Sequence, residues 1–211
     1  LLLIRLLFAN IHAIRNVFEM TDIILPMIQQ IALQAKDASR ALSSATTIHK
    51  NDALQAIARE LESNRKILIE ENEKDLKAAK ENGLTDAMVD RLRLNHERID
   101  GMVQGLRQLI ELPDPVGGLI EEKTPANGLN IRKVRTPIGV IGIIYESRPN
   151  VTIDCAGLCL KSGNASILRG GKEALHSNRA LASIINSALS RSEIPENAVQ
   201  LIPTSDRAAL N

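Results

Sequence analysis

Aromatic residues are scarce in this sequence, which has one tyrosine, two phenylalanines and no tryptophan among 211 residues. Single-stranded nucleic acids are bound largely by stacking bases on aromatic rings, so this scarcity argues against such a partner. Charge of one sign is also missing, because 26 basic side chains face 25 acidic ones for a net charge of +1. A nucleic-acid-binding face needs a concentrated basic excess, so the composition predicts no nucleic-acid partner.

Cysteine is equally rare, with Cys155 and Cys159 alone in the whole chain. Two cysteines do not make a disulfide framework, which favours a reducing, cytoplasmic compartment. Residues four apart share one face of a helix. No histidine or third cysteine lies close to them in sequence, so we predict that they pack in the interior and that the chain holds no metal.

Long apolar runs are absent too. Residues 1–8 are apolar apart from Arg5, but this run is too short to cross a bilayer and lacks a signal-peptide cleavage site. We therefore predict no association with membranes. The chain does not begin with methionine, whereas Met20 and Met27 lie downstream. We expect residues 1–26 to be a non-native or disordered extension, with a genuine N-terminal helix as the alternative.

Residues 27–112 carry apolar side chains at the three- and four-residue spacing of amphipathic helices. Gly83 can end one helix in a left-handed conformation, and Thr85 and Asn95 can cap two more. Pro113 cannot continue a helix. We interpret this region as the helical N-terminal part of a larger domain and assign it no chemistry.

Residues 113–136 change in character. Two short segments flank Asn127-Gly128, a dipeptide that strongly favours a tight hairpin turn. The pattern predicts a separate β-hairpin.

Residues 137–211 alternate between short apolar runs and helical periods. We predict strands at 140–145, 165–168 and 198–202, with helices at 151–161 and 173–190. The first run does not alternate, which indicates a strand buried on both faces. Two right-handed βαβ units make half of a doubly wound sheet. A further helix beginning at Asp206 has no room to finish, so we expect a truncated α/β fold with an open, parallel, Rossmann-like sheet.

Ligands of such sheets bind beyond the carboxyl ends of the strands. One loop there contains Arg169, Gly170, Gly171, Lys172 and Glu173. Its glycines let backbone N–H groups approach an anion, the next helix presents a positive end, and two cations add charge. The pattern matches neither the Rossmann nor the Walker fingerprint. A phosphate site and a tight turn with solvated charges both stay open.

The other strand-end loop contains Ser147, Arg148, Pro149 and Asn150. The Asn150 amide could stabilise an oxyanion or simply cap the next helix. Arg148 could bind a carboxylate or form a surface ion pair. Position alone leaves these alternatives open.

Four segments resemble the γ-glutamyl phosphate reductase family, and the resemblance extends from about Met27 to Asn211. They are residues 82–92, 112–117, 136–152 and 159–173. The resemblance implies an aldehyde dehydrogenase-like fold with a cofactor domain, a catalytic domain and an oligomerisation hairpin, which corresponds to residues 113–136. It also implies reduction of γ-glutamyl 5-phosphate to glutamate 5-semialdehyde with NADPH, in proline biosynthesis, by a homo-oligomer. In that family a cysteine thiolate attacks the acyl phosphate.

The resemblance further implies roles for the two loops. Asn150 corresponds to an oxyanion-stabilising asparagine, and Ser147, Arg148 and Pro149 line the nicotinamide or substrate end. Residues 169–173 meet the adenosine side of the cofactor, where Arg169 and Lys172 can pair with the 2′-phosphate.

The family's catalytic cysteine lies further along the chain than Asn211, and neither Cys155 nor Cys159 falls in its motif. Residues 137–211 are then an incomplete dinucleotide-binding unit without the catalytic domain, and we expect the 211-residue chain alone to be inactive. Alternatives are another NAD(P)-dependent aldehyde dehydrogenase, a non-catalytic nucleotide-binding module, or part of a synthase fused to a glutamate kinase.

Overall fold

The computed structural model describes residues 24–204, and the elements up to the hairpin are helical. The first described helix covers residues 24–43. It is followed by α2 (Thr47–Ser63), α3 (Arg65–Glu81), α4 (Asp86–Leu92) and α5 (His96–Glu111). The predicted caps are present: the Thr85 hydroxyl accepts from the Met88 N–H, and the Asn95 side chain accepts from the Arg98 N–H. Gly83 has a φ of +70°, as expected for a left-handed helix end.

Most of the predicted N-terminal extension, residues 1–23, lies outside the described residues. Residues 24–26, which we also assigned to it, are helical. Ile24 is buried and packs against Ile202, which directly follows the last strand of the parallel sheet. This apolar contact explains why the helix begins earlier than the sequence pattern indicated.

The sheet contains β3 (Val140–Ile144), β4 (Ala165–Arg169) and β5 (Val199–Leu201) in the order β3-β4-β5, all parallel. They are joined by α6 (Asn150–Lys161) and α7 (Leu175–Leu189), as the alternating pattern predicts. The single 3₁₀ turns Lys172–Ala174 and Glu196–Ala198 precede α7 and β5. The predicted helix at 173–190 therefore starts as a 3₁₀ turn.

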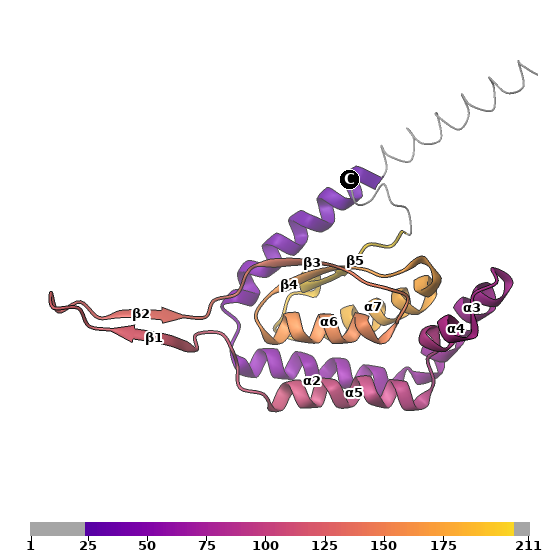
Figure 1. Cartoon of the computed structure of the whole chain (residues 1–211), viewed down its shortest axis with the longest axis horizontal. Coiled ribbons are helices and arrows are strands. Elements are labelled where there is room, and N and C mark those ends of the chain that lie inside the picture. Colours follow the sequence, from indigo (N-terminus) through magenta and orange to yellow (C-terminus); the bar gives the residue numbers. More distant parts are fainter. Residues whose placement is uncertain (1–23, 205–211) are drawn as a thin grey trace, which may run out of the picture.

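The elements form layers around one main core. The helices α6 and α7 lie on one face of the sheet, and α2 and α5 pack against them from outside (Figure 1). The helix over residues 24–43 lies on the opposite face, where the Gln200 side chain of β5 donates to the Ile31 carbonyl at 2.9 Å. The carboxyl ends of β3 and β4 are thus held in a packed framework.

The strand β3 departs from our prediction of burial on both faces. Its residues are half-buried or exposed, and Ile144 is 64% exposed. Among the described strands β3 pairs with β4 alone. The apolar cluster under the helix over residues 24–43 includes Ile167 of β4 and no residue of β3. The central strand β4 is largely buried.

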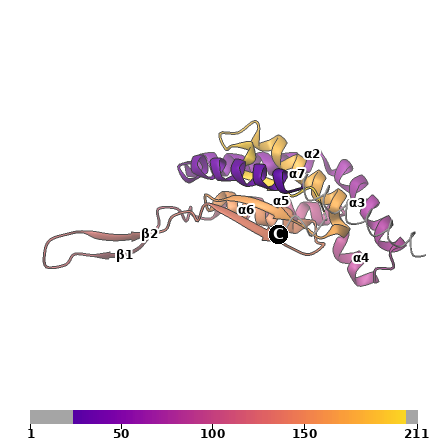
Figure 2. The same ribbon diagram turned by 90° about the horizontal axis from the view of Figure 1, so that it is seen from above.

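A two-stranded antiparallel hairpin projects from this body (Figures 1 and 2). It consists of β1 (Leu119–Lys123) and β2 (Ile131–Val134), with Glu122 opposite Arg132. Gly128 has a φ of +79° at the predicted turn. Every residue of both strands is exposed. No helix within residues 24–204 has the length and apolar character needed to cross a membrane.

Candidate functional site

The two predicted loops meet beyond the carboxyl ends of β3 and β4. The Ser147 hydroxyl donates to the Glu173 carboxylate at 2.5 Å, and this contact joins residues from the two loops. The Tyr145 N–H donates to the Arg169 carbonyl at 3.0 Å, which extends the pairing of β3 with β4 to the base of both loops. The structure therefore brings together the two segments that sequence analysis selected.

Gly170 and Gly171 are required at this junction because the loops approach each other closely. A Cβ atom on Gly171 would lie 2.2 Å from the Ser147 Oγ, and one on Gly170 would lie 2.1 Å from the Asn178 Nδ2. Neither glycine has a positive φ. Their role is close packing of backbone against side chains, rather than a left-handed turn.

Two cations flank these glycines. Arg169, the last residue of β4, is half-buried, and Lys172 begins the 3₁₀ turn and is exposed. Together they place two positive charges at the loop junction, and this arrangement suits a phosphate group.

The helix N-terminus that we expected to assist them is already occupied. The carboxylate of Asp75, a buried residue of α3, accepts from the His176 N–H at 3.1 Å and from the Ser177 N–H at 2.8 Å. These are N–H groups of the first turn of α7, which an anion would otherwise use. The expectation of a free helix end is wrong, and Arg169 and Lys172 carry the positive charge of the loop.

The Asn150 side chain does not cap α6, which would require it to accept a hydrogen bond from a backbone N–H of the first helical turn. Pro149 precedes α6 as its N-cap and makes no side-chain cap. The Asn150 Nδ2 donates instead to Asp154 Oδ2 at 3.1 Å, which uses one of its two N–H donors. The capping alternative is therefore wrong.

A polar groove of about 810 Å³ lies beside Asn150, between α6 and the α4–α5 region. Its lining includes Arg148, Asn150 and Asp154 from one side and Arg91 and Arg98 from the other. Partial burial raises the pKa of the Asp154 carboxyl above its ordinary value, against the opposing hydrogen bond from Asn150. The groove offers several cations and acids to a polar ligand.

A second groove, of about 410 Å³, lies directly over the loop junction. Its lining includes Ser147, Arg148, Gly171 and Glu173, with Leu84, Met88 and Arg91 from the α4 side. Arg148 and Arg91 line both grooves, so these two cations connect the junction with the groove beside Asn150. Sequence analysis missed the α4 residues, because their pattern is that of an ordinary amphipathic helix.

The two cysteines are free and lie on α6. Burial raises the pKa of the Cys159 thiol to about 11, and burial also raises the pKa of Cys155. Protonated thiols are poor nucleophiles, which agrees with the predicted packing role. Within residues 24–204 no group of three metal-ligating side chains comes together.

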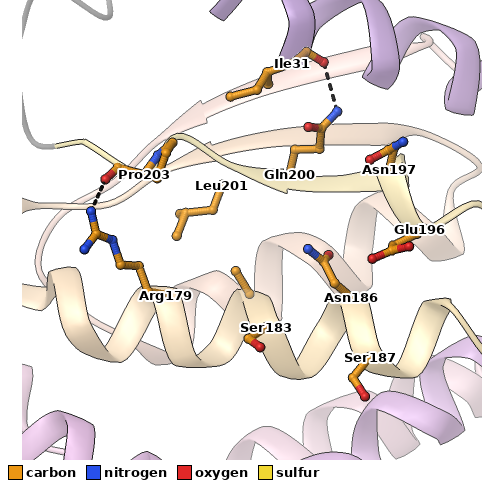
Figure 3. A pocket seen from close by; sticks show the side chains of 11 residues that line it. Ile31, Arg179, Ser183, Asn186, Ser187, Glu196, Asn197, Gln200, Leu201 and Pro203 are labelled. Carbon is orange, nitrogen blue, oxygen red and sulfur yellow. Dashed lines mark hydrogen bonds between the residues drawn. The ribbon is translucent and has the colours of Figure 1, made fainter. Parts of the chain in front are cut away.

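Another groove, of about 570 Å³, lies between α7, β5 and the helix over residues 24–43 (Figure 3). The Arg179 side chain reaches across it to the Pro203 carbonyl at 2.5 Å, and Gln200 closes its other side through Ile31 (Figure 3). None of the predicted site residues lines this groove.

The chain is similar to known proteins over most of its length. A family model described as the aldehyde dehydrogenase family matches residues 17–211. The chain is 54% identical over 184 residues to a γ-glutamyl phosphate reductase of Opitutus terrae, covering 87% of this chain and 43% of that protein.

Solved structures give the same result. The γ-glutamyl phosphate reductase of Thermotoga maritima matches with a TM-score of 0.83 and 47% identity, over 85% of this chain and 44% of that one. The Saccharomyces cerevisiae enzyme of that name matches with a TM-score of 0.80 and 38% identity, over 85% and 47% of the two chains. A probable aldehyde dehydrogenase of Listeria monocytogenes, at 14% identity, shares the fold (TM-score 0.67) over 90% of this chain and 39% of that one. The chain spans less than half the length of each of these relatives.

Proposed function

The chain belongs to the aldehyde dehydrogenase family, and from this membership we propose that it forms part of an NADPH-dependent γ-glutamyl phosphate reductase. The reaction reduces γ-glutamyl 5-phosphate to glutamate 5-semialdehyde and releases phosphate, a step of proline biosynthesis. The observation that carries the proposal is the 54% identity to a curated protein of that name. Because the chain spans 43% of that relative, the activity is that of a longer protein.

Family membership implies use of NAD(P), and the loop at residues 169–173 fits the phosphates of such a nucleotide. Gly170 and Gly171 let the two loops lie in close contact, which places Arg169 and Lys172 on either side of the loop junction. We assign Arg169 and Lys172 to the 2′-phosphate that distinguishes NADPH from NADH, because this phosphate, additional to the pyrophosphate, calls for additional cations. When bound, the nucleotide supplies the hydride.

The groove beside Asn150 fits the glutamyl substrate. Arg148 can bind a carboxylate or phosphate oxygen as a bidentate donor, and it lies between the two grooves. The second N–H of the Asn150 amide is the donor that we assign to the developing oxyanion. Ser147 and Pro149 hold this loop, Ser147 through Glu173 and Pro149 through its buried position before α6.

The nucleophile is a cysteine outside this chain. Cys155 and Cys159 have raised thiol pKa values and lie in the packed helix α6. A thiolate that displaces phosphate from the acyl group forms a thioester, which hydride transfer then converts to the aldehyde and the free thiolate. We expect no turnover by residues 1–211 alone.

The experiment uses the full-length protein and the reverse reaction, in which glutamate 5-semialdehyde, phosphate and NADP⁺ are consumed. We expect turnover that depends on phosphate and exceeds turnover of other aldehydes. Lys172→Gln should raise the KM for NADP⁺ about tenfold, the size of one lost charge-assisted hydrogen bond, and leave the KM for NAD⁺ unchanged. Lys66→Gln, at an exposed position of α3, is the matched control. Equal rates with unrelated aldehydes would exclude the glutamyl substrate.

We also propose that the hairpin is an intersubunit contact and that the protein is a cytoplasmic homo-oligomer. The hairpin exposes Leu119, Ile120, Ile131 and Val134, at 41–53% of their surface, on an arm that projects away from the described helices and the parallel sheet (Figures 1 and 2). Ile120→Glu and Ile131→Glu together should lower the mass measured by light scattering. An unchanged mass would exclude this contact. The unpaired cysteines suit a reducing compartment, and fractionation of cells tests the location.

A further inference from the structure

Three side chains form a continuous hydrogen-bonded chain beneath the two loops. Tyr145, directly after β3, places its hydroxyl 2.7 Å from the Thr152 Oγ1 in the first turns of α6. The Thr152 hydroxyl donates to the Asn178 Oδ1 of α7 at 2.9 Å. Because that single proton is used toward Asn178, the Tyr145 hydroxyl must be the donor to Thr152. The direction of every bond in this chain is therefore fixed.

The chain closes into a ring through the second loop. The Asn178 Nδ2 lies against Gly170, where a Cβ atom would be 2.1 Å from it and 3.0 Å from the Tyr145 ring. The Tyr145 N–H donates to the Arg169 carbonyl. We call Tyr145, Thr152, Asn178 and Gly170 the loop ring, because it links β3, α6, α7 and the strand-end loop after β4.

The loop ring is buried where its hydrogen bonds meet. Thr152 is fully buried and Asn178 is 2% exposed, whereas Tyr145 is half-buried. Buried polar side chains that satisfy one another fix a unique arrangement, and removing one member leaves the others without partners. The ring is thus suited to set the position of the elements from which both loops begin.

We infer that Thr152 and Asn178 are positioning residues, which hold the loops at 146–150 and 169–173 at the separation that nucleotide binding requires. This inference rests on the proposed function for the ligand, but the loops' order can be measured without it. Thr152 is the link that both bonds share, so it is the residue to change.

The test compares Thr152→Val with Thr152→Ser in the full-length protein. Valine has nearly the same shape and lacks the hydroxyl, so both bonds are lost, whereas serine keeps the hydroxyl. Thr47→Val is the matched control, because that threonine hydroxyl bonds to Asp114 at the hairpin root. NADPH binding is measured by nicotinamide fluorescence, and amide hydrogen exchange is followed separately in the two loops.

We expect Thr152→Val to weaken NADPH binding about tenfold and to speed exchange in both loops by a similar factor, since it leaves buried hydrogen-bonding groups unpaired. Thr152→Ser and Thr47→Val should match the wild type in both loops. Wild-type exchange in both loops of Thr152→Val would overturn the inference, as would faster exchange spread evenly over all described helices. If the wild-type protein binds no NADPH or NADP⁺, the proposed function fails, and loop exchange alone then decides for or against the ring.

Discussion

The Lys50 Nζ lies 2.5 Å from the Asp114 Oδ2 at the root of the hairpin, and the Lys50 side chain is only 1% exposed. Asp114 also accepts from the Thr47 hydroxyl at 2.8 Å and from the Val116 N–H at 3.0 Å. A charge so deeply buried needs a counter-charge close by. Asp114 therefore ties α2 to the segment from which the hairpin extends.

Replacing Asp114 by alanine should destabilise the protein by about 3 kcal/mol, because Lys50 is left buried without its partner. Urea unfolding at neutral pH measures the loss. The control is Asp37→Ala, which removes the exposed ion pair with Arg40 and should cost less than about 0.5 kcal/mol. Equal effects of the two substitutions would show that the buried pair contributes no more than a surface pair.

The same pair predicts a dependence of stability on acid. Burial alone would raise the pKa of Asp114, but the bonds from Lys50, Val116 and Thr47 outweigh it and hold the pKa below its ordinary value. A carboxyl with a lowered folded-state pKa stabilises the protein fully above its unfolded pKa of about 3.9, and this contribution is lost as pH falls through the folded value. The difference in unfolding free energy between wild type and Asp114→Asn should therefore shrink below pH of about 4. A constant difference from neutral pH downward would contradict this account.

Two helical glycines should respond to alanine with opposite signs. In Gly157 of α6, a Cβ atom would lie 2.9 Å from the side chains of both Leu106 and Leu109, so alanine overpacks the contact with α5 and should cost about 1–3 kcal/mol. At Gly105 of α5, no atom outside the adjacent residues and the nearby helix backbone lies within 4 Å of the added Cβ, so alanine should stabilise the helix by about 0.5–1 kcal/mol. Thermal melts of the two variants give the comparison. Stabilisation by Gly157→Ala would mean that α5 and α6 lie further apart.

The sequence was sufficient where structure depends on neighbours along the chain. Helix periodicity, the caps Thr85 and Asn95, and the Asn127-Gly128 turn are local signals, and each was found where predicted. Burial of a strand is not local. The exposure of β3 depends on which element covers its outer face, and the apolar run at residues 140–144 carries no information about that neighbour.

The site shows the same division. Its two loops could be predicted because the carboxyl ends of parallel strands meet at one edge of the sheet. The carboxylate that occupies the α7 N-terminus could not be, since Asp75 lies 101 residues before His176 in sequence. The bond between Asn150 and Asp154 is local, but capping would use the Oδ1 of the same side chain as an acceptor, and the sequence did not show that the N-cap position belongs to Pro149.

Tyr145 is the single tyrosine of the chain, so its ionisation can be followed directly by absorbance in residues 1–211. Burial raises the pKa of its hydroxyl to about 12. In urea the midpoint should return to about 10. The folded protein favours the neutral hydroxyl of Tyr145. Its contribution to the free energy of unfolding is therefore fully present below the unfolded pKa of about 10, and it is lost as pH rises through the folded-state pKa. A midpoint of about 10 in the folded protein, with circular dichroism showing that the fold persists, would mean that the hydroxyl faces water.

Gly171→Ala tests whether close approach of the two loops creates the nucleotide site. The added Cβ would lie 2.2 Å from the Ser147 Oγ and 3.0 Å from its backbone nitrogen, so the loops must separate. We expect NADPH binding in the full-length protein to weaken about tenfold or more, corresponding to roughly 1–3 kcal/mol of strain. Gly105→Ala serves as the control.

The double variant Ser147→Ala with Gly171→Ala separates the clash of the added Cβ with the Ser147 hydroxyl from its clash with the Ser147 backbone nitrogen. Removing the Ser147 hydroxyl relieves the contact at 2.2 Å but leaves the one at 3.0 Å, so binding should recover in part. Residues in direct contact give non-additive effects, and the double-mutant cycle should show a coupling of about 0.5–3 kcal/mol. Additive losses would mean that Ser147 and Gly171 act independently, and the loop junction would then not be the feature that shapes the site.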